Sequence, residues 1–238
     1  MPVGSFKCAS FGGDPFSVNN PNASASGIDT PYGVFDSQSG ANIIGGAAIG
    51  NYVALGATHS ESLLGSELDP YTGGAKHPNG VIYPGGKTSI RDIVDGTTNT
   101  LIACETKEIT LAAWFDGATA AVVGLVVNGN TNSPVSFTKQ TVPPTANYGI
   151  PTPLTGTNKV VTTLNYGDDS VNPPKQYLTT GPDGLPWVHG PSSEHPGVVN
   201  HLLGDASVRS VSETLDTTLY MHLITRAGKE PVNEFNKE

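Results

Sequence analysis

The chain of 238 residues is poor in positive charge and in cysteine. It has 12 Lys and Arg against 21 Asp and Glu, for a formal net charge of −9. No basic surface is available to neutralise phosphates, so we predict that the protein does not bind nucleic acid. The cysteines Cys8 and Cys104 lack the CxxC spacing of structural zinc sites. We predict that they are either buried free thiols or a disulfide joining the N-terminal segment to the body.

Long apolar runs are also absent. No run approaches the roughly 20 residues that a transmembrane helix needs. The first residues have neither the basic nor the apolar region of a signal peptide. Charged residues make up only 14% of the chain, while Gly (29) and Pro (19) are abundant. This composition is more typical of a periplasmic, cell-surface or secreted protein than of a cytosolic enzyme, so we expect an extracytoplasmic location.

Short apolar runs alternate with long turn-rich stretches, a pattern that predicts a β-rich domain. The predicted strands cover residues 51–55, 101–106, 120–127, 159–164, 198–203 and 207–211. The continuous β-branched run 120–127 is typical of a strand buried on both faces. A short helix over 90–94 would be capped by Ser89 and end near Gly96. A second helix is predicted because Leu215, Leu219, Tyr220, Leu223 and Ile224 fall on one helical face. Arg226 would lie in its last turn, and Gly228 would end it.

The fold class predicted from these elements is α+β, with mainly antiparallel sheet, long loops and one or two short helices. No fixed-period repeat or clear linker divides the chain, so we predict a single domain over residues 1–238. Within it, residues 1–50 form an irregular lead-in, 51–228 the core and 229–238 a tail.

Two segments resemble motifs of a large protein family that is greatly expanded in planctomycetes. Residues 89–105, which include Ile-Arg-Asp-Ile-Val-Asp-Gly-Thr-Thr-Asn-Thr and end in Glu105, resemble its IRDITDGTSNT…E segment. Residues 190–211 resemble its GPSSxHPGGVNVLFADGSVRFIS segment, which carries an H-x9-DG motif. Shorter matches lie around Cys8, at residues 51–53 and at 225–228, where the family has CPSDP, SYVG and GTRAGGE.

Members of that family resemble pseudopilins, in which a long apolar N-terminal helix precedes a β-rich head. The resemblance implies that this chain is such a head without the helix. It would have a structural role in a filament, secretion apparatus or cell-surface assembly and would not be an enzyme. Its partners would be copies of itself or related pilin-like subunits, and only the absent helix would meet the membrane. The motif glycine after Asp205 is Ala206 here, which disfavours a positive φ, so we expect the hairpin turn to be rebuilt.

Several acidic residues and one histidine are candidate metal ligands. His195 and Asp205 suit zinc or another transition metal. Because pseudopilin heads often bind calcium in a C-terminal loop, the resemblance implies Ca²⁺ as the cofactor in the region of Asp205. The adjacent carboxylates of Asp168 and Asp169 are another candidate calcium site, although a solvated loop is the favoured interpretation there. The alternative is that His195 and Asp205 only brace the hairpin through hydrogen bonds. The motif residues with an expected structural role are Asp92, Asp95, Gly96, Asn99, Glu105, His195, Gly197, Asn200, Asp205 and Arg209; of these, Asp92, Asp95 and Glu105 could also bind a cation.

A hydrolase or metal-dependent enzyme is the alternative from a different class. It would use Ser192 or Ser193 as the nucleophile, with His195 and Asp205. No Gly-x-Ser-x-Gly elbow occurs, and adjacent serines in a Pro-Gly loop are usually turn formers. We therefore expect no catalysis at these residues.

His201 is a further potential ligand or acid–base group, and the two tryptophans could bind glycans. Strand alternation predicts that the His201 side chain faces away from Asn200, so it need not converge with the other histidines. Trp114 and Trp187 could form a platform for glycans, or they could pack in the core and loops.

Overall fold

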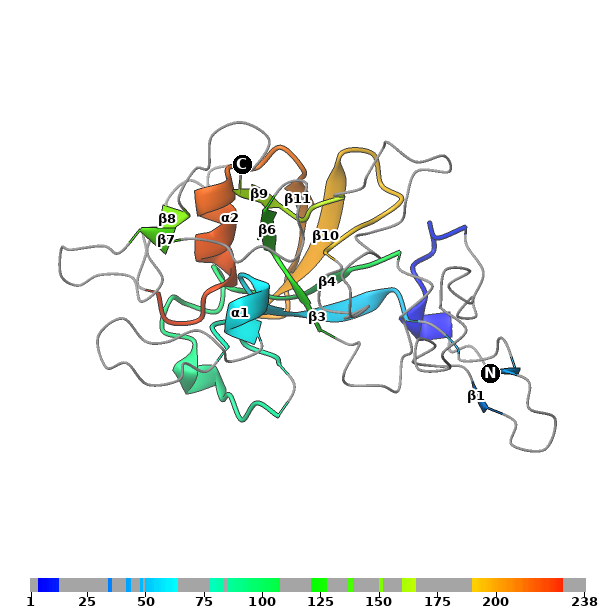
Figure 1. Ribbon diagram of the computed structural model, residues 1–238, viewed down its shortest axis with the longest axis horizontal. Coiled ribbons are helices and arrows are strands. Elements are labelled where there is room, and N and C mark those ends of the chain that lie inside the picture. Colours follow the sequence, from blue (N-terminus) through cyan, green and yellow to red (C-terminus); the bar gives the residue numbers. More distant parts are fainter. Residues whose placement is uncertain are drawn as a thin grey trace.

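The main feature of the fold is a 5-stranded sheet with the strand order β11-β10-β4-β3-β5 (Figure 1). The computed structural model describes residues 4–12, 34–35, 42–43, 48, 50–63, 78–83, 85–107, 121–127, 137–138, 150–151, 160–165 and 190–228. The sheet strands are β3 (Tyr52–Ala57), β4 (Leu101–Glu105), β5 (Ala121–Val123), β10 (Val198–Leu203) and β11 (Val208–Ser212). All neighbouring strands are antiparallel except β3 and β5, which are parallel. The β-rich α+β class is confirmed, and the sheet is mixed.

The remaining elements are short. The α-helices are α1 (Ser60–Leu63) and α2 (Thr217–Ile224), and the 3-10 helices are η1 (Gly4–Phe6) and η2 (Ile90–Asp92). Three strand pairs form separate two-stranded sheets that are not part of the main sheet: β1 (Val34–Phe35) with β2 (Asn42–Ile43), β6 (Leu125–Val127) with β9 (Val160–Thr162), and β7 (Phe137–Thr138) with β8 (Ile150–Pro151). In the part of the chain that the structure describes, no helix has the length and apolar character needed to cross a membrane.

The core lies between the sheet and α2. Asp216 caps this helix, because its carboxylate accepts hydrogen bonds from the backbone N–H groups of Thr218 (2.9 Å) and Leu219 (3.0 Å). The helix then buries its apolar face against the sheet and against β6 and β9; the buried residues that meet there are Val53, Leu55, Leu101, Cys104, Val122, Leu125, Val160, Leu164, Val199, Leu203, Val211, Tyr220, Met221, Leu223 and Ile224. The core therefore lies on the α2 side of the sheet.

The apolar run 120–127 forms two strands where the sequence predicts one. The break is at Gly124, beside α2, where a Cβ atom would lie 2.1 Å from Ile224 Cδ1. At this residue the chain stops pairing with β3 and starts pairing with β9. Burial on both faces is confirmed for β5, whose residues are all buried.

The first predicted helix is a single 3-10 turn, shorter than the 90–94 expected. Ser89 caps it as predicted, and Asp92 completes a capping box by accepting hydrogen bonds from Ser89 N (2.8 Å) and Oγ (2.7 Å). These bonds lower the pKa of the exposed Asp92 carboxyl. The chain turns away at Gly96, which has a φ of +94°.

The hairpin between β10 and β11 keeps its tight turn, so the predicted rebuilding is wrong. Ala206 adopts a φ of +69° and donates its N–H to Leu203 O (3.0 Å). The Asp205 carboxylate accepts hydrogen bonds from Ser207 N (2.9 Å) and Oγ (2.6 Å), which lower its pKa and stabilise the turn. Local hydrogen bonds thus compensate for the strain of a side chain in the left-handed region.

Candidate functional site

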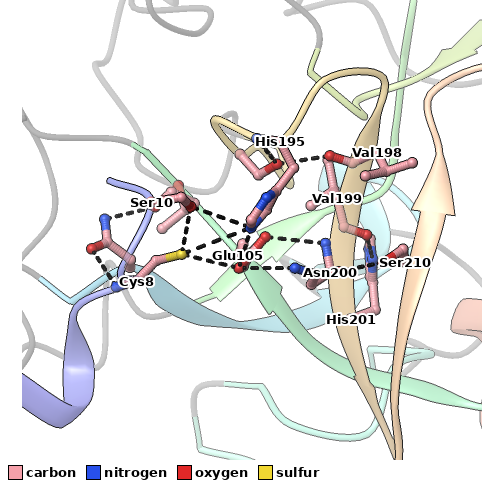
Figure 2. Close-up of polar contacts among 12 residues, drawn as sticks. Cys8, Ser10, Glu105, His195, Val198, Val199, Asn200, His201 and Ser210 are labelled. Carbon is pink, nitrogen blue, oxygen red and sulfur yellow. Dashed lines mark hydrogen bonds and ion pairs between the residues drawn. The ribbon is translucent and has the colours of Figure 1, made fainter. Parts of the chain in front are cut away.

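Polar side chains from distant segments meet at one end of β4 (Figure 2). Cys8 and Ser10 come from the N-terminal segment, Glu105 from the end of β4, His195 from the loop before β10, and Asn200 from β10 itself. We call these residues the Cys8 cluster. They lie on the face of the sheet opposite α2, because Asn200 alternates with the buried residues of β10 that face the helix.

Asn51, immediately before β3, attaches the N-terminal segment to the sheet. Its side-chain oxygen accepts the backbone N–H of Cys8 (3.1 Å), and its side-chain nitrogen donates to Thr106 O (3.0 Å). Its backbone N–H donates to Phe6 O (2.8 Å). Asn51 is buried, so these bonds are shielded from water and fix Cys8 beside the end of β4.

The two serines of the 190–197 loop position His195. Ser193 Oγ accepts the backbone N–H of His195 (3.0 Å) and donates to Val198 O (2.7 Å). Ser192 N donates to Glu105 O (2.8 Å), and Ser192 Oγ accepts a backbone N–H. Both serines are buried and their hydroxyls bond to backbone groups, so neither reaches an imidazole as a nucleophile would.

The Glu105 carboxylate is the centre of the cluster. Only 6% of this side chain is exposed, and burial of a charge is costly unless polar groups compensate it. Asn200 donates its backbone N–H to Oε2 and its amide to Oε1, each over 3.2 Å. The Asn200 amide is held in turn by Ser210 Oγ, which donates to its oxygen (2.6 Å). The hydrogen bonds from Asn200 therefore hold the Glu105 carboxylate in place independently of Cys8 and His195.

The thiol, the imidazole and the carboxylate converge on one another. Glu105 Oε1 is 3.3 Å from Cys8 Sγ and 3.6 Å from His195 Nε2, and Sγ is 4.0 Å from Nε2. Ser10 Oγ is 3.0 Å from Sγ and 3.2 Å from Nε2. The contacts of His195 with Cys8, Ser10 and Glu105 all use the same imidazole nitrogen, Nε2. A catalytic triad would place the carboxylate on the other nitrogen, Nδ1, so the arrangement resembles a metal site more than a triad.

Asp205 does not join His195, which corrects both the metal pair and the Ser–His–Asp arrangement considered from the sequence. His195 precedes β10 and Asp205 follows it. Six strand residues separate them by about 20 Å, because a strand rises about 3.3 Å per residue. Strand β10 therefore keeps His195 and Asp205 at opposite ends of the motif. Asp205 stabilises the turn through its hydrogen bonds to Ser207, which agrees with the bracing interpretation for this residue.

The acidic residues of the 89–105 segment do not share one site either. Asp95 accepts hydrogen bonds from Gly228 N (2.7 Å) and Thr225 Oγ1 (3.4 Å), whereas Glu105 lies at the other end of β4. Asn99 Nδ2 donates to Asp95 O (3.4 Å), in agreement with its predicted structural role. Thr97 O accepts the N–H of Asp205 (3.1 Å), so this turn also holds the hairpin tip. Of the other motif residues, Gly197 has a φ of +71° and Arg209 pairs in register with His201.

Both cysteines are free thiols, so the disulfide considered from the sequence is not formed. Cys104 packs in the core with α2, while its neighbour Glu105 faces the Cys8 cluster. Successive side chains of a strand point to opposite faces, so Cys104 faces away from Cys8. Burial raises the pKa of the Cys104 thiol, which makes it unreactive.

His201 faces the core, as strand alternation predicts. Its Nδ1 is 2.9 Å from Val199 O and its Nε2 is 2.9 Å from the Tyr220 hydroxyl. Burial lowers its pKa to about 4, so it is neutral near pH 7. His201 therefore supports the fold and does not reach the Cys8 cluster.

The short segments that carry the family resemblance thus gather at the two ends of β4. A family model described as a protein of unknown function, DUF1559, matches residues 36–218. The chain belongs to this family. No curated protein and no solved structure matches the chain. Membership of DUF1559 therefore assigns no activity, and the site must be interpreted from its geometry.

Some predicted residues lie outside the described part of the chain, namely Asp168, Asp169, Trp114 and Trp187. Calcium or glycan binding there stays a prediction. In contrast, sequence reasoning did not foresee the roles of Ser10 and Asn51. The sequence signal that could have identified these two residues is their position in the family-like segments. Ser10 lies in the CPSDP-like segment and Asn51 in the SYVG-like segment.

Proposed function

We propose that this DUF1559 member is a pseudopilin-like head domain outside the cytoplasm, with a structural role in a filament, a secretion apparatus or a cell-surface assembly. The observation that carries the proposal is that residues of the family-like segments form hydrogen bonds that hold the fold together. Asp95, Asn51 and Ser192 bond to the backbone of distant segments, as expected of residues that build a scaffold.

An assembly subunit needs a contact surface. Ile90 (75% exposed) and Val94 (57% exposed) lie together on and just after η2, and they support the proposal because large apolar side chains in one exposed loop favour association. The partners would be copies of this chain or related pilin-like subunits.

Photo-crosslinking in cells tests the assembly role. A photoreactive amino acid at Ile90 is compared with one at Glu194, an exposed residue of the loop beside the Cys8 cluster. We expect the protein in the envelope fraction or the medium, with crosslinked species of higher mass from position 90 and far fewer from position 194. A cytosolic protein without crosslinks from either position would contradict the proposal.

One contact favours the hydrolase alternative. Ser10 Oγ is 3.2 Å from His195 Nε2, which is within reach of a nucleophile and its base. The same nitrogen also faces Cys8 and Glu105, so the Glu105 carboxylate does not orient the imidazole from Nδ1 as the carboxylate of a triad would. We therefore expect no turnover of ester substrates above that of the His195→Ala variant, and activity lost in both Ser10→Ala and His195→Ala would favour the hydrolase.

A further inference from the structure

We propose that Cys8, Glu105 and His195 form a zinc site that fastens the N-terminal segment to the sheet. The ligand atoms are Cys8 Sγ, Glu105 Oε1 and His195 Nε2. This inference goes beyond the assembly role and does not depend on it, because it concerns how one chain is held together.

The spacing of the donor atoms fits a tetrahedral ion. With ordinary zinc–sulfur, zinc–nitrogen and zinc–oxygen bond lengths, the ligands of a tetrahedral site are about 3.4–3.6 Å apart. Here the separations are 3.3 Å (Sγ to Oε1), 3.6 Å (Nε2 to Oε1) and 4.0 Å (Sγ to Nε2). Movements of a few tenths of an ångström would bring all the atoms onto one ion. Figure 2 shows the sulfur, the imidazole and the carboxylate facing one another.

The donor set selects the metal. A thiolate and an imidazole favour zinc and related transition metals over calcium and magnesium, which prefer oxygen ligands. The Glu105 carboxylate is also oriented by Asn200, which is fixed by Ser210. Such outer hydrogen bonds hold the ligands of metal sites in place.

Charge supports a cation at this position. Glu105 is buried, and burying a carboxylate is costly unless a positive charge or hydrogen bonds compensate it. A divalent ion would compensate the Glu105 carboxylate and the Cys8 thiolate together.

Ser10 marks the fourth position. Its hydroxyl is close to both Cys8 Sγ (3.0 Å) and His195 Nε2 (3.2 Å) and is exposed. The fourth ligand would be this hydroxyl or a water molecule in its place. Because the ligands are 97 and 187 residues from Cys8 along the chain, one ion would close two very long loops.

Cobalt substitution tests the site directly. Co²⁺ is added to the reduced, metal-free full chain, and the absorption spectrum is recorded in the near-ultraviolet and the visible range. We expect one equivalent to give the intense bands of tetrahedral Co²⁺ together with a thiolate-to-cobalt charge-transfer band, and Zn²⁺ to displace it. The bands should be lost in Cys8→Ser and strongly reduced in Glu105→Gln and His195→Gln.

Matched controls separate this site from other donors. Cys104→Ala removes the other thiol, and Asp205→Asn removes the motif carboxylate at the far end of β10; both should keep the bands. A thiolate band that persists in Cys8→Ser, or no thiolate band in the native chain, would overturn the proposal.

A second measurement uses only the native sequence, in case a variant does not fold. Zn²⁺ should slow the alkylation of Cys8 by iodoacetamide at least tenfold, and a chelator should restore the rate. Zn²⁺ at 100 times its Kd should raise the folding equilibrium constant about 100-fold. Unchanged alkylation and stability would refute the zinc site, while the crosslinks from position 90 would still test the assembly role separately.

Discussion

At the scale of single residues, the buried pair of His201 and Tyr220 has a defined protonation pattern. Val199 O can only accept, so His201 Nδ1 carries the proton and donates to it. His201 Nε2 must then accept a hydrogen bond from the Tyr220 hydroxyl. This arrangement satisfies both side chains in a fully buried place and favours the neutral imidazole.

Stability should therefore depend on pH through His201. Its pKa is about 4 in the folded chain against 6.5 when unfolded, so the unfolded state binds the proton first. The free energy of unfolding should be unaffected by His201 above pH 6.5 and fall by about 3 kcal/mol from pH 6.5 to pH 4. Urea unfolding across this range measures it.

The control is His201→Gln, which keeps an acceptor for Tyr220 but does not titrate. This variant should be less stable at pH 7 and should depend less on pH between 6.5 and 4. Equal pH dependence in both proteins would show that His201 does not carry this effect.

Ala206 gives a second prediction at this scale. Its φ of +69° is unfavourable for alanine and ordinary for glycine. Ala206→Gly should raise the free energy of unfolding by about 0.5–1 kcal/mol, after the greater entropy of glycine in the unfolded chain is allowed for. Ala54→Gly in β3, where φ is not positive, should instead destabilise the protein. Chemical denaturation of both variants measures the sign, and a destabilised Ala206→Gly contradicts the argument.

At the scale of elements, the 190–197 loop depends on its packing against the end of β9. A Cβ atom on Gly190 would lie 2.1 Å from Thr163 Cβ and 2.6 Å from its backbone oxygen. Backbone cannot move aside as a flexible side chain can. The loop that carries His195 therefore requires glycine at its start.

Gly190→Ala should destabilise the protein by about 2 kcal/mol or more, as expected for overpacking in a buried place. The matched control is Gly12→Ala, where nothing lies within 4 Å of the added atom and little change is expected. Thermal unfolding compares the two variants. Similar melting temperatures for both would show that the loop tolerates displacement.

At the scale of the whole molecule, Asp95 joins segments that are far apart in sequence. It accepts hydrogen bonds from Thr225 and Gly228, which are 130 and 133 residues away. In the same turn, the N–H groups of Val94 and Asp95 donate to Arg226 O. Arg226 in turn donates to the carbonyls of Pro78 and Gly80. This end of β4 thus holds the hairpin tip, the segment after α2 and residues 78–80 together.

Asp95→Ala should lower the free energy of unfolding by about 1.5–3 kcal/mol, because it removes the charged acceptor of a part-buried hydrogen bond and leaves a donor unpaired. Asp92→Ala removes an exposed cap and should have a smaller effect. Amide hydrogen exchange of Gly228 checks the mechanism, since it should accelerate only in the Asp95 variant. Equal effects of both substitutions would contradict a central role for Asp95.

The local elements were largely predictable. The strands at 52–57, 101–105, 198–203 and 208–212 follow from short apolar runs between turn-rich stretches, and Ser89 follows from capping chemistry. The break at Gly124 was not predictable, because it depends on Ile224 of α2 packing against that residue. The parallel pairing of β5 with β3 likewise depends on how distant strands align.

The sequence by itself determined where strands and turns form and which residues of β10 face the core, because these follow from side-chain alternation and backbone preferences within a few residues. Only the tertiary structure decided that Cys8, Glu105 and His195 meet while His195 and Asp205 separate. The physical reason is that convergence across 97 and 187 residues is set by sheet order and by the bonds of Asn51 and Ser193, which no local pattern encodes.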